Sequence, residues 1–379
     1  MDKLLMLPGP TIVPSEVLLA MAKPTIGHRS KEFGEIFYDT IEKLKKVFIT
    51  ENDTFIVTGS GTATMDMAIS NIIKKGDKVL TIITGNFGER FANIVESYKG
   101  KAIKLEYEWG DLAKPEDVKE ILDKEEDIKA VTIVHNETST GARNYIDKIG
   151  KVVKDYDALY IVDTISSLGG DYVNVDKFHI DICVTGSQKC LAAPPGLAGI
   201  TVSEKAWEVI NKNENEKVGF YLDLKAYKKY LEKKQNPYTP AVNLIYALNK
   251  ALELVLEEGI ENRVKRHERL AKATRAGLEE MGIELFAKEE ARSITVTSAK
   301  YPNGIDDKLR EIMNKKYNIV IAGGQKHLSG KIFRIGHMGI CGEKEILATL
   351  SCLELALKEL GFNIEGSGVE KAKEILSKL

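Results

Sequence analysis

Short apolar segments alternate with amphipathic ones along the first half of the chain. Seven runs rich in β-branched residues occur at 54–57, 78–83, 102–105, 130–134, 158–162, 182–184 and 199–202. Between several of them, at 63–73, 89–98 and 115–122, apolar residues recur with a helical period. Strands and helices that alternate at this spacing are typical of βαβ units. Because the runs are apolar throughout, we expect strands covered on both faces, and so an α/β fold with a mainly parallel sheet.

The pattern changes after Pro240. Two long helical patterns cover 241–258 and 261–281, and each is followed by a glycine, a common helix stop (Gly259 and Gly282). Apolar runs at 293–297, 319–321 and 332–335 then precede helical patterns at 343–360 and 369–379. Separated strands and helices of this kind indicate a smaller α+β domain.

The length of 379 residues fits two or three domains at roughly 150 residues each. We expect a boundary near the end of the first long helix. The predicted division is an N-terminal segment at 1–20, a large domain at 21–255 and a small C-terminal domain at 256–379.

Charge and composition exclude several classes of protein. Lys and Arg number 54 against 56 Asp and Glu, so there is no excess of basic residues for nucleic acid or for an anionic membrane. No apolar run has the length of a membrane span, and prolines interrupt the apolar N-terminus too early for a signal peptide. The four cysteines form no CxxC pair. We therefore expect a soluble cytoplasmic protein with reduced thiols and no metal site.

A glycine-rich turn follows the first apolar strand. The segment Thr58-Gly59-Ser60-Gly61-Thr62-Ala63-Thr64 opens a helical pattern, which places backbone N–H groups and hydroxyls at a positive helix end. It is not the dinucleotide fingerprint, because Thr64 occupies the third glycine position. A phosphate site and an ordinary capped turn fit the motif equally well.

Two further residues follow later strands. Asp163 ends an apolar run, where ligand sites of open α/β sheets lie, although alone it also fits a helix cap. Lys189 lies just beyond another apolar run and is surrounded in sequence by small residues. Partial burial at such a place would favour the neutral form of its amine, which is the nucleophilic form. Alternatively, its ammonium group reaches water past the sheet edge. Together the turn, the acid and the lysine are the parts that a pyridoxal phosphate enzyme needs: a phosphate cradle, a partner for the ring nitrogen and a Schiff-base lysine.

The chain resembles the class-V, fold-type I aminotransferases, in particular the alanine–glyoxylate and serine–pyruvate group. The matching segments are PGP at 8–10, GSG at 59–61, STG at 139–141, VD at 162–163, GSQK at 186–189, APPG at 193–196, FYLD at 220–223 and FRIG at 333–336. The resemblance implies a large domain with a mainly parallel seven-stranded sheet and a C-terminal α+β domain over the site. It also implies pyridoxal 5'-phosphate and a homodimer with shared active sites.

The resemblance implies roles for individual residues. Lys189 would be the Schiff-base lysine and Asp163 the partner of the pyridinium nitrogen. The phosphate would be held by Ser60, Gly61, Thr62 and Gln188. The ring would lie between Phe87 and Ile165, with Thr138 near its O3′ side. Arg334 would bind the substrate carboxylate, for which a planar guanidinium is well suited.

Further positions come from the same resemblance. Thr239 would reach the phosphate of the neighbouring subunit, whereas the tyrosine that some relatives place three residues earlier is Asn236 here, with Tyr238 nearby. Arg29 would pair with a second anionic group of the substrate, or form an interface salt bridge. His135 is interpreted as a packed histidine without a catalytic role.

The resemblance implies ping-pong transfer of an amino group. The expected donors are alanine, serine, aspartate or glutamate, and the expected acceptors are glyoxylate, pyruvate or 2-oxoglutarate. One alternative is a cysteine desulfurase-like lyase, but the loop before Arg334, at 323–330, lacks the mobile cysteine that such enzymes need. The other is a non-catalytic subunit that keeps the fold, against which Lys189, Asp163 and Arg334 argue.

Overall fold

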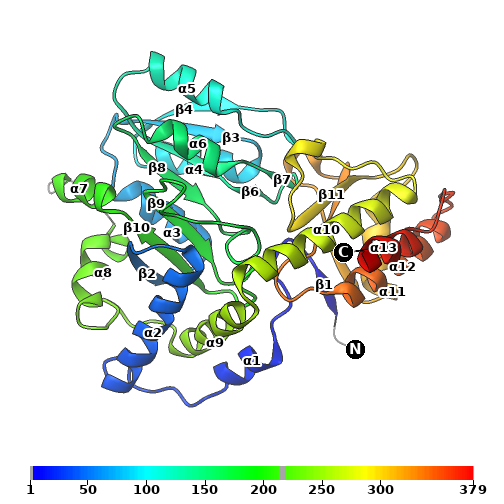
Figure 1. The fold of residues 1–379 in the computed structure, drawn as a ribbon, viewed down its shortest axis with the longest axis horizontal. Coiled ribbons are helices and arrows are strands. Elements are labelled where there is room, and N and C mark those ends of the chain that lie inside the picture. Colours follow the sequence, from blue (N-terminus) through cyan, green and yellow to red (C-terminus); the bar gives the residue numbers. More distant parts are fainter. Residues whose placement is uncertain (1–2, 214–218, 379) are drawn as a thin grey trace.

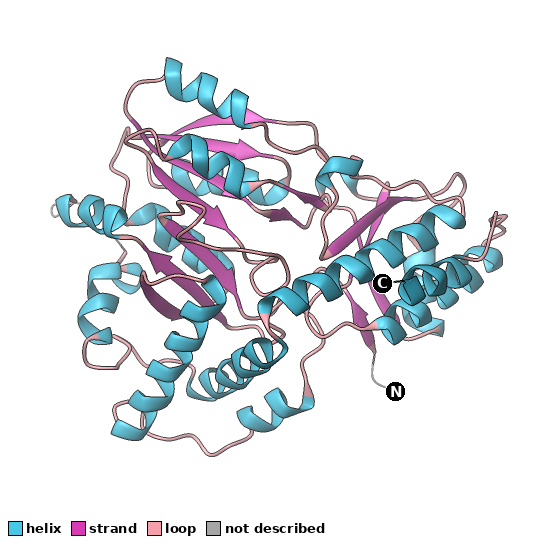
Figure 2. Ribbon diagram, viewed as in Figure 1, coloured by secondary structure: helices cyan, strands magenta, loops and turns pink. Residues whose placement is uncertain are grey.

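The computed structural model describes residues 3–213 and 219–378 (Figures 1 and 2). The last residue of the helix predicted at 369–379 therefore lies outside the described residues. The other strands and helices predicted from the sequence can be compared with the structure directly.

A seven-stranded sheet forms the centre of the larger part of the molecule (Figure 2). Its strands, in spatial order, are β2 (Asp53–Thr58), β10 (Leu197–Val202), β9 (Ile182–Gly186), β8 (Leu159–Asp163), β5 (Ile128–Val134), β3 (Lys78–Ile83) and β4 (Lys101–Glu106). Only β10 runs antiparallel to its neighbours within this sheet. The predicted mainly parallel seven-stranded sheet is confirmed.

Helices cover both faces of this sheet. Alternate residues of β8 belong to different cores, with Tyr160 and Val162 on one face and Leu159 and Ile161 on the other. The first face packs against α2 (Lys31–Phe48), α5 (Pro115–Lys124), α6 (Ile146–Val153) and α9 (Val242–Glu258). The second packs against α3 (Gly61–Ser70), α4 (Asn86–Ser97), α7 (Glu204–Lys212) and α8 (Leu224–Leu231). The two-sided burial explains why most strands read as continuous apolar runs.

One strand departs from that expectation. β4 lies at the edge of the sheet, and its residues Lys101, Lys104 and Glu106 are exposed. Full burial on both faces was therefore the wrong prediction for the run at 102–105. An edge strand needs charged side chains to prevent pairing with other chains, which accounts for its lysines.

A second, four-stranded sheet lies beside the first and joins the two ends of the chain (Figure 1). Its order is β1 (Leu4–Met6), β12 (Ile319–Gly323), β13 (Ile332–Gly336) and β11 (Val296–Lys300). It shares a core with α10 (Ile260–Glu280), α11 (Lys308–Lys316), α12 (Glu343–Glu359) and α13 (Gly368–Lys378). The N-terminal segment continues from β1 to α1 (Ser15–Met21), which packs on α9. The domain boundaries at 20 and 255 stay predictions.

The strand predicted at 293–297 begins later, at Val296. Ser293 accepts hydrogen bonds through its Oγ from the backbone N–H groups of Thr295 and Val296, at 3.0 and 3.2 Å, so this segment turns before the strand begins. A serine that bonds to the backbone two or three residues ahead competes with strand pairing, which the apolar pattern does not reveal.

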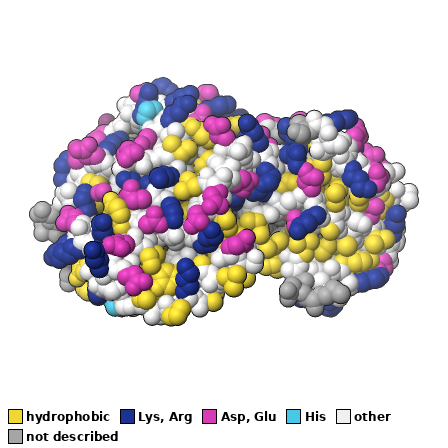
Figure 3. All heavy atoms as spheres, turned by 60° about the horizontal axis from the view of Figure 1, so that its bottom comes forward, with side chains coloured by type: hydrophobic (Ala, Val, Ile, Leu, Met, Phe, Trp, Pro, Cys, Tyr) yellow, Lys and Arg dark blue, Asp and Glu magenta, His cyan; other side chains and the backbone are white. Residues whose placement is uncertain are grey.

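Two findings concern the chain as a whole. No helix in the described part of the chain is long and apolar enough to cross a membrane. On the face shown in Figure 3, basic and acidic side chains are interspersed, without a large area of one sign. This distribution agrees with the near-zero net charge of the sequence.

Candidate active site

The ends of several strands surround a cavity of about 200 Å³. The residues that line it are Ser60, Gly61, Thr62, Phe87, Arg90, Val134, Asn136, Thr138, Asp163, Ile165, Ser166, Gln188 and Lys189. Nine of them were predicted as site residues. They meet because parallel strands place the loops that follow them at one edge of the sheet.

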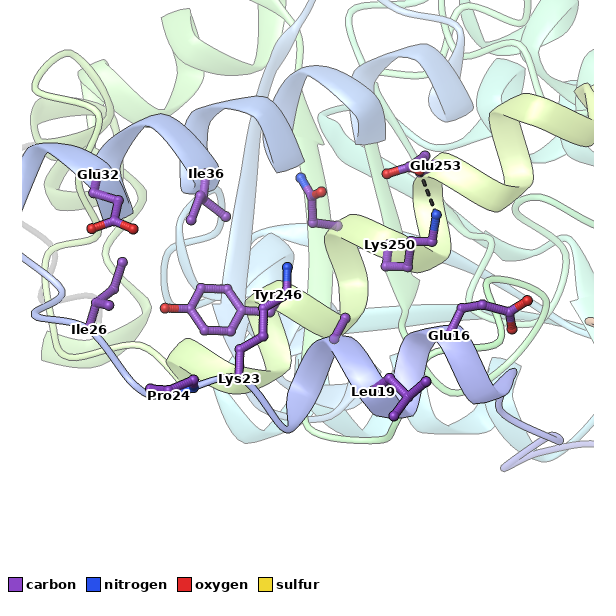
Figure 4. Close-up of a pocket in the computed structure, with 12 residues that line it drawn as sticks. Glu16, Leu19, Lys23, Pro24, Ile26, Glu32, Ile36, Tyr246, Lys250 and Glu253 are labelled. Carbon is purple, nitrogen blue, oxygen red and sulfur yellow. Dashed lines mark hydrogen bonds and ion pairs between the residues drawn. The ribbon is translucent and has the colours of Figure 1, made fainter.

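A larger hollow, of about 830 Å³, lies between α1, α2 and α9 (Figure 4). Leu19, Lys23, Tyr246 and Glu253 are among the residues that line it, and Lys250 forms an ion pair there with Glu253. None of the predicted site residues lines this hollow. Volume alone therefore does not identify the site; the gathered polar groups of the smaller cavity do.

Asp163 ends β8 and is 3% exposed. Its Oδ1 accepts a hydrogen bond of 2.7 Å from the backbone N–H of Ile165. Burial, with a smaller contribution from the nearby Glu137 carboxylate, raises the pKa of Asp163 to about 7. No Lys, Arg or His nitrogen of the described chain lies within ion-pair distance of this carboxylate. A cationic group bound next to this buried carboxyl group would therefore stabilise its charged form.

Lys189 follows β9 and reaches back to the N-terminal segment. Its Nζ donates a hydrogen bond to the backbone carbonyl of Pro8. Burial lowers the pKa of Lys189 to about 8, and the guanidinium groups of Arg334 and Arg90 act in the same direction. A substantial fraction of neutral amine is therefore present near neutral pH.

Gly9 is required beside this lysine. Its φ is +106°, and a Cβ atom built on it would lie 2.3 Å from Cδ of Lys189. The backbone conformation favours glycine here, and any side chain at this position would have to displace Lys189. The PGP segment at 8–10 was identified only as part of the resemblance; its contact with a lysine 180 residues away has no signal in the local sequence.

The turn after β2 forms a cradle at the N-terminus of α3. Ser60, the residue before the helix, makes no capping hydrogen bond with its side chain, so the first N–H groups of α3 are not used by it. Gly61 is packed so closely that an added Cβ would lie 2.5 Å from Cδ1 of Ile165. The buried Oε1 of Gln188 has no hydrogen-bond partner in the described structure. The free N–H groups at the start of α3, rather than this acceptor oxygen, suit an anion with several oxygen atoms.

Phe87 lies in the first turn of α4, where Glu137 fixes the helix end. The Glu137 carboxylate accepts hydrogen bonds from the backbone N–H groups of Phe87, at 2.9 Å, and Gly88, at 3.1 Å. An acidic side chain at a helix N-terminus is electrostatically favourable. The helical pattern predicted a start at 89, and Glu137 was not predicted as a site residue, although it lies two positions before the STG segment at 139–141.

Arg334 lies on β13 of the second sheet and is 5% exposed. It donates hydrogen bonds to the carbonyl of Gly323 from Nε and Nη2, at 2.8 and 2.6 Å, and to that of Thr138 from Nη1, at 2.6 Å. Burial lowers the pKa of Arg334 to about 10. Within the described residues it has no carboxylate at ion-pair distance, and its contact with Thr138 brings it to the edge of the cavity.

Arg29 and Thr239 do not line the cavity of their own chain. Arg29 donates to the backbone carbonyls of Asn236 and Pro237, and Thr239 Oγ1 lies 3.5 Å from Nε2 of His28. Asn236 is buried, and its Nδ2 donates to the carbonyl of Ile56. The expected roles of Arg29 and Thr239 toward substrate and the neighbouring phosphate stay predictions.

His135 is buried beside the site without lining it. Its Nδ1 lies 2.9 Å from Ser167 Oγ, and its Nε2 lies 3.6 Å from Oδ2 of Asp171. Burial lowers the pKa of His135 to about 4, so the ring is neutral at physiological pH. This environment agrees with a packed histidine.

Several known proteins are similar to this chain over almost its whole length. A family model described as "Aminotransferase class-V" matches residues 5–339. An uncharacterized aminotransferase of Methanocaldococcus jannaschii is 81% identical, over 99% of this chain and 98% of the relative. A soluble hydrogenase small subunit of Synechococcus is 41% identical, over 99% and 98%. A serine–glyoxylate aminotransferase of Methylorubrum extorquens is 37% identical, over 98% and 95%.

Solved structures agree with these relatives. The crystal structure of ureidoglycine–glyoxylate aminotransferase from Bacillus subtilis has a TM-score of 0.96 and 35% identity, covering 100% of this chain and 98% of that one. Pyridoxamine–pyruvate aminotransferase from Mesorhizobium loti has a TM-score of 0.95 and 31% identity, covering 100% and 98%. Both similarities confirm the predicted fold class.

Proposed function

We propose that this chain, which belongs to the class-V aminotransferase family, transfers the amino group of a small or acidic amino acid to a 2-oxo acid. The expected 2-oxo acids are glyoxylate, pyruvate and 2-oxoglutarate. The chain is a pyridoxal-phosphate-dependent transaminase. The observation that carries the finer proposal is the meeting of Lys189, Asp163 and the α3 cradle around one cavity, with Arg334 at its edge. Relatives named for glyoxylate as acceptor support the choice of oxo acid.

The residues of the cavity fit the cofactor. Asp163 is buried, has a raised pKa and has no cation at ion-pair distance among the described residues, which suits a ring nitrogen that carries a proton. The first N–H groups at the start of α3, which the Ser60 side chain does not use, can donate to a phosphate. Ser60, Gly61, Thr62 and Gln188 would hold the phosphate, while Phe87 and Ile165 would enclose the ring.

Each residue then has a defined task. Bound pyridoxal phosphate supplies an aldehyde that condenses with amines and a ring that accepts electrons. Asp163 keeps the ring nitrogen protonated. The amine of Lys189, partly neutral because it is buried, removes the proton at the α-carbon of the first amino acid and, in the second half-reaction, delivers a proton to the α-carbon of the new one. Arg334 orients the substrate by binding its carboxylate.

A ping-pong order fits a single small cavity. Because one cavity serves both substrates, the oxo acid formed from the first amino acid leaves before the second oxo acid enters. The same residues then act in reverse order on the second substrate. We therefore expect parallel lines in double-reciprocal plots with both substrates varied.

A homodimer is part of the proposal. Phe220 is 84% exposed and, with Tyr221, packs on Tyr238 close to the cradle, where Tyr221 donates to the carbonyl of Thr58. An exposed aromatic cluster beside a site suits burial by another copy of the chain. Thr239 would then serve the neighbouring site. A cytoplasmic location fits the four free cysteines.

The two alternatives have less support. Cys190 adjoins the lysine, but burial raises its thiol pKa to about 12, so it lacks the thiolate that a desulfurase needs. The relative named as a hydrogenase subunit favours an assembly role. However, a subunit that only assembles would not need three buried ionisable residues at one cavity, namely Lys189, Asp163 and Arg334.

The test is a set of half-reactions. Purified enzyme is mixed with single amino acids, then with single 2-oxo acids, while the cofactor spectrum is recorded. We expect conversion by alanine, serine, aspartate or glutamate, and reversal by glyoxylate or another of the named oxo acids. Spectral change without release of an oxo acid would favour a lyase, and no change with any amino acid would favour the non-catalytic subunit.

Gly9→Ala is expected to displace Lys189. The added Cβ would overlap the lysine side chain and would also be strained at a φ of +106°. We expect loss of most lysine-linked cofactor, measured after borohydride reduction. Gly304→Ala is the matched control, because Gly304 has a φ of +81° but open space around it. Equal cofactor content in the two variants would contradict the packing role of Gly9.

The rate of cofactor attachment is expected to depend on pH with a midpoint near 8. The lowered pKa of Lys189 means that the neutral amine forms as pH rises through about 8, rather than through the usual value of 10.5. Apoenzyme mixed with pyridoxal phosphate should therefore attach it faster from pH 6 to 8 and level off above about 9. A rate that keeps rising tenfold per pH unit up to 10 would show an ordinary lysine.

A further inference from the structure

Arg90 lines the cavity but was not among the predicted site residues. It lies on α4, one turn after Phe87, and its guanidinium carbon lies 4.6 Å from the centre of the Phe87 ring. Its Nη1 donates a hydrogen bond of 2.9 Å to Thr62 Oγ1, in the cradle at the start of α3. Arg90 thus connects the aromatic wall of the cavity with its anion-binding end.

The positive charge of Arg90 has no acidic partner in the described chain. Across residues 3–213 and 219–378, no carboxylate lies within ion-pair distance of its guanidinium group, and the neighbouring Glu89 contacts Lys326 instead. The guanidinium group has five N–H donors. In the described structure, one hydrogen bond to a protein atom is found, from Nη1. A cation in this state at the edge of an anion cradle is available to a ligand.

The contact with Thr62 also fixes the direction of a hydroxyl proton. A guanidinium group can only donate, so Thr62 Oγ1 must accept from Arg90. The single proton of the Thr62 hydroxyl is then free to be donated into the cavity. Stacking on Phe87 restricts the guanidinium group, which keeps this arrangement in place before any ligand arrives.

We propose that Arg90 is a positioning residue for the phosphate end of the cofactor: it is held on Phe87, turns the Thr62 hydroxyl toward the phosphate and adds a positive charge there. The inference rests on the proposed function, because it needs a phosphate in this cradle. Its charge also favours the anionic form of Asp163 and the neutral form of Lys189.

The test is a double-mutant cycle on binding rather than on activity. Pyridoxamine phosphate is the probe, because it has no aldehyde and binds without a covalent link. We expect Arg90→Met and Thr62→Val each to weaken its binding, Arg90→Met on the order of tenfold or more, as for a lost hydrogen bond that depends on charge. The double variant should lose less than the product of the two losses, since the hydroxyl needs Arg90 to be oriented.

Dephosphorylated pyridoxamine shows which end of the cofactor is affected. We expect its affinity to change less than twofold in Arg90→Met. Equal losses for both probes, independent effects of the two substitutions, or unchanged binding of pyridoxamine phosphate in Arg90→Met would overturn the inference. Failure of the wild-type enzyme to bind pyridoxamine phosphate would instead refute the proposed function.

Two controls keep the result interpretable. Arg269→Met removes an arginine that pairs with Glu343 on the surface and should leave both affinities unchanged. Arg90→Lys keeps the charge without the planar group, and it should recover part of the affinity for pyridoxamine phosphate. If Arg90→Met does not fold, Arg90→Gln, which also removes the charge, replaces it in the cycle with the same criteria.

Discussion

Asp163→Asn is expected to bind the cofactor but to react with amino acids two to three orders of magnitude more slowly. An amide cannot stabilise a protonated ring nitrogen, so the ring accepts electrons poorly, and roughly 10²–10³-fold is the scale for loss of one electrostatic group at a reacting centre. Stopped-flow half-reactions with saturating cofactor measure this rate. Asp306→Asn, in an exposed loop, is the control and should be unaffected. Near-wild-type rates in Asp163→Asn would contradict the assigned role.

The same substitution should stabilise the apoprotein at neutral pH. The pKa of Asp163 is raised from 3.8 to about 7 in the folded protein, so folding becomes less favourable as pH rises between these values. The loss at pH 8 is at most about 4 kcal/mol. Apo Asp163→Asn should therefore unfold at a higher temperature than wild-type apoprotein at pH 8, with the difference nearly gone at pH 4. A binding site that lowers the stability of the apoprotein before its ligand binds is typical of functional sites.

We expect Arg334→Ala to lower the half-reaction rate at limiting amino acid concentration by at least a hundredfold. A bidentate arginine–carboxylate contact in a buried site contributes several kcal/mol, which corresponds to roughly 10²–10³-fold. Amines without a carboxylate should react as slowly with the variant as with the wild-type enzyme, because they never use the contact. The measurement is the half-reaction rate for both kinds of substrate.

The structural contacts of Arg334 require a further comparison. It also donates to the carbonyls of Gly323 and Thr138, so its removal can loosen the loop before β13. The cofactor spectrum and the melting temperature report on that effect. If amines with and without a carboxylate lost reactivity equally, Arg334 would be a structural residue.

Most of the cavity could be predicted because its residues follow strands. Asp163 and Lys189 come directly after buried apolar runs, and Ser60 to Thr62 open a helix after another. Topology then brings these segments together without further information. The predicted sheet succeeded for the same reason, since seven apolar runs alternate with helical patterns.

The residues that were missed depend on contacts that no local pattern encodes. Gly9 meets a lysine across 180 positions, and Glu137 caps a helix 50 positions before it. Arg90 did have a signal, because residues three apart share one side of a helix and Phe87 was already assigned. Arg29 and Thr239 do not line the cavity of one chain, so the roles proposed for them would need a second copy of the chain.

The attachment site of the cofactor tests the central claim most directly. The purified enzyme is reduced with borohydride, digested, and its labelled peptide is sequenced by mass spectrometry, with Lys189→Ala as the matched variant. We expect one pyridoxyl group per chain on Lys189 and none in the Lys189→Ala variant. A label on another lysine, or no label after incubation of the wild-type enzyme with pyridoxal phosphate, would contradict it.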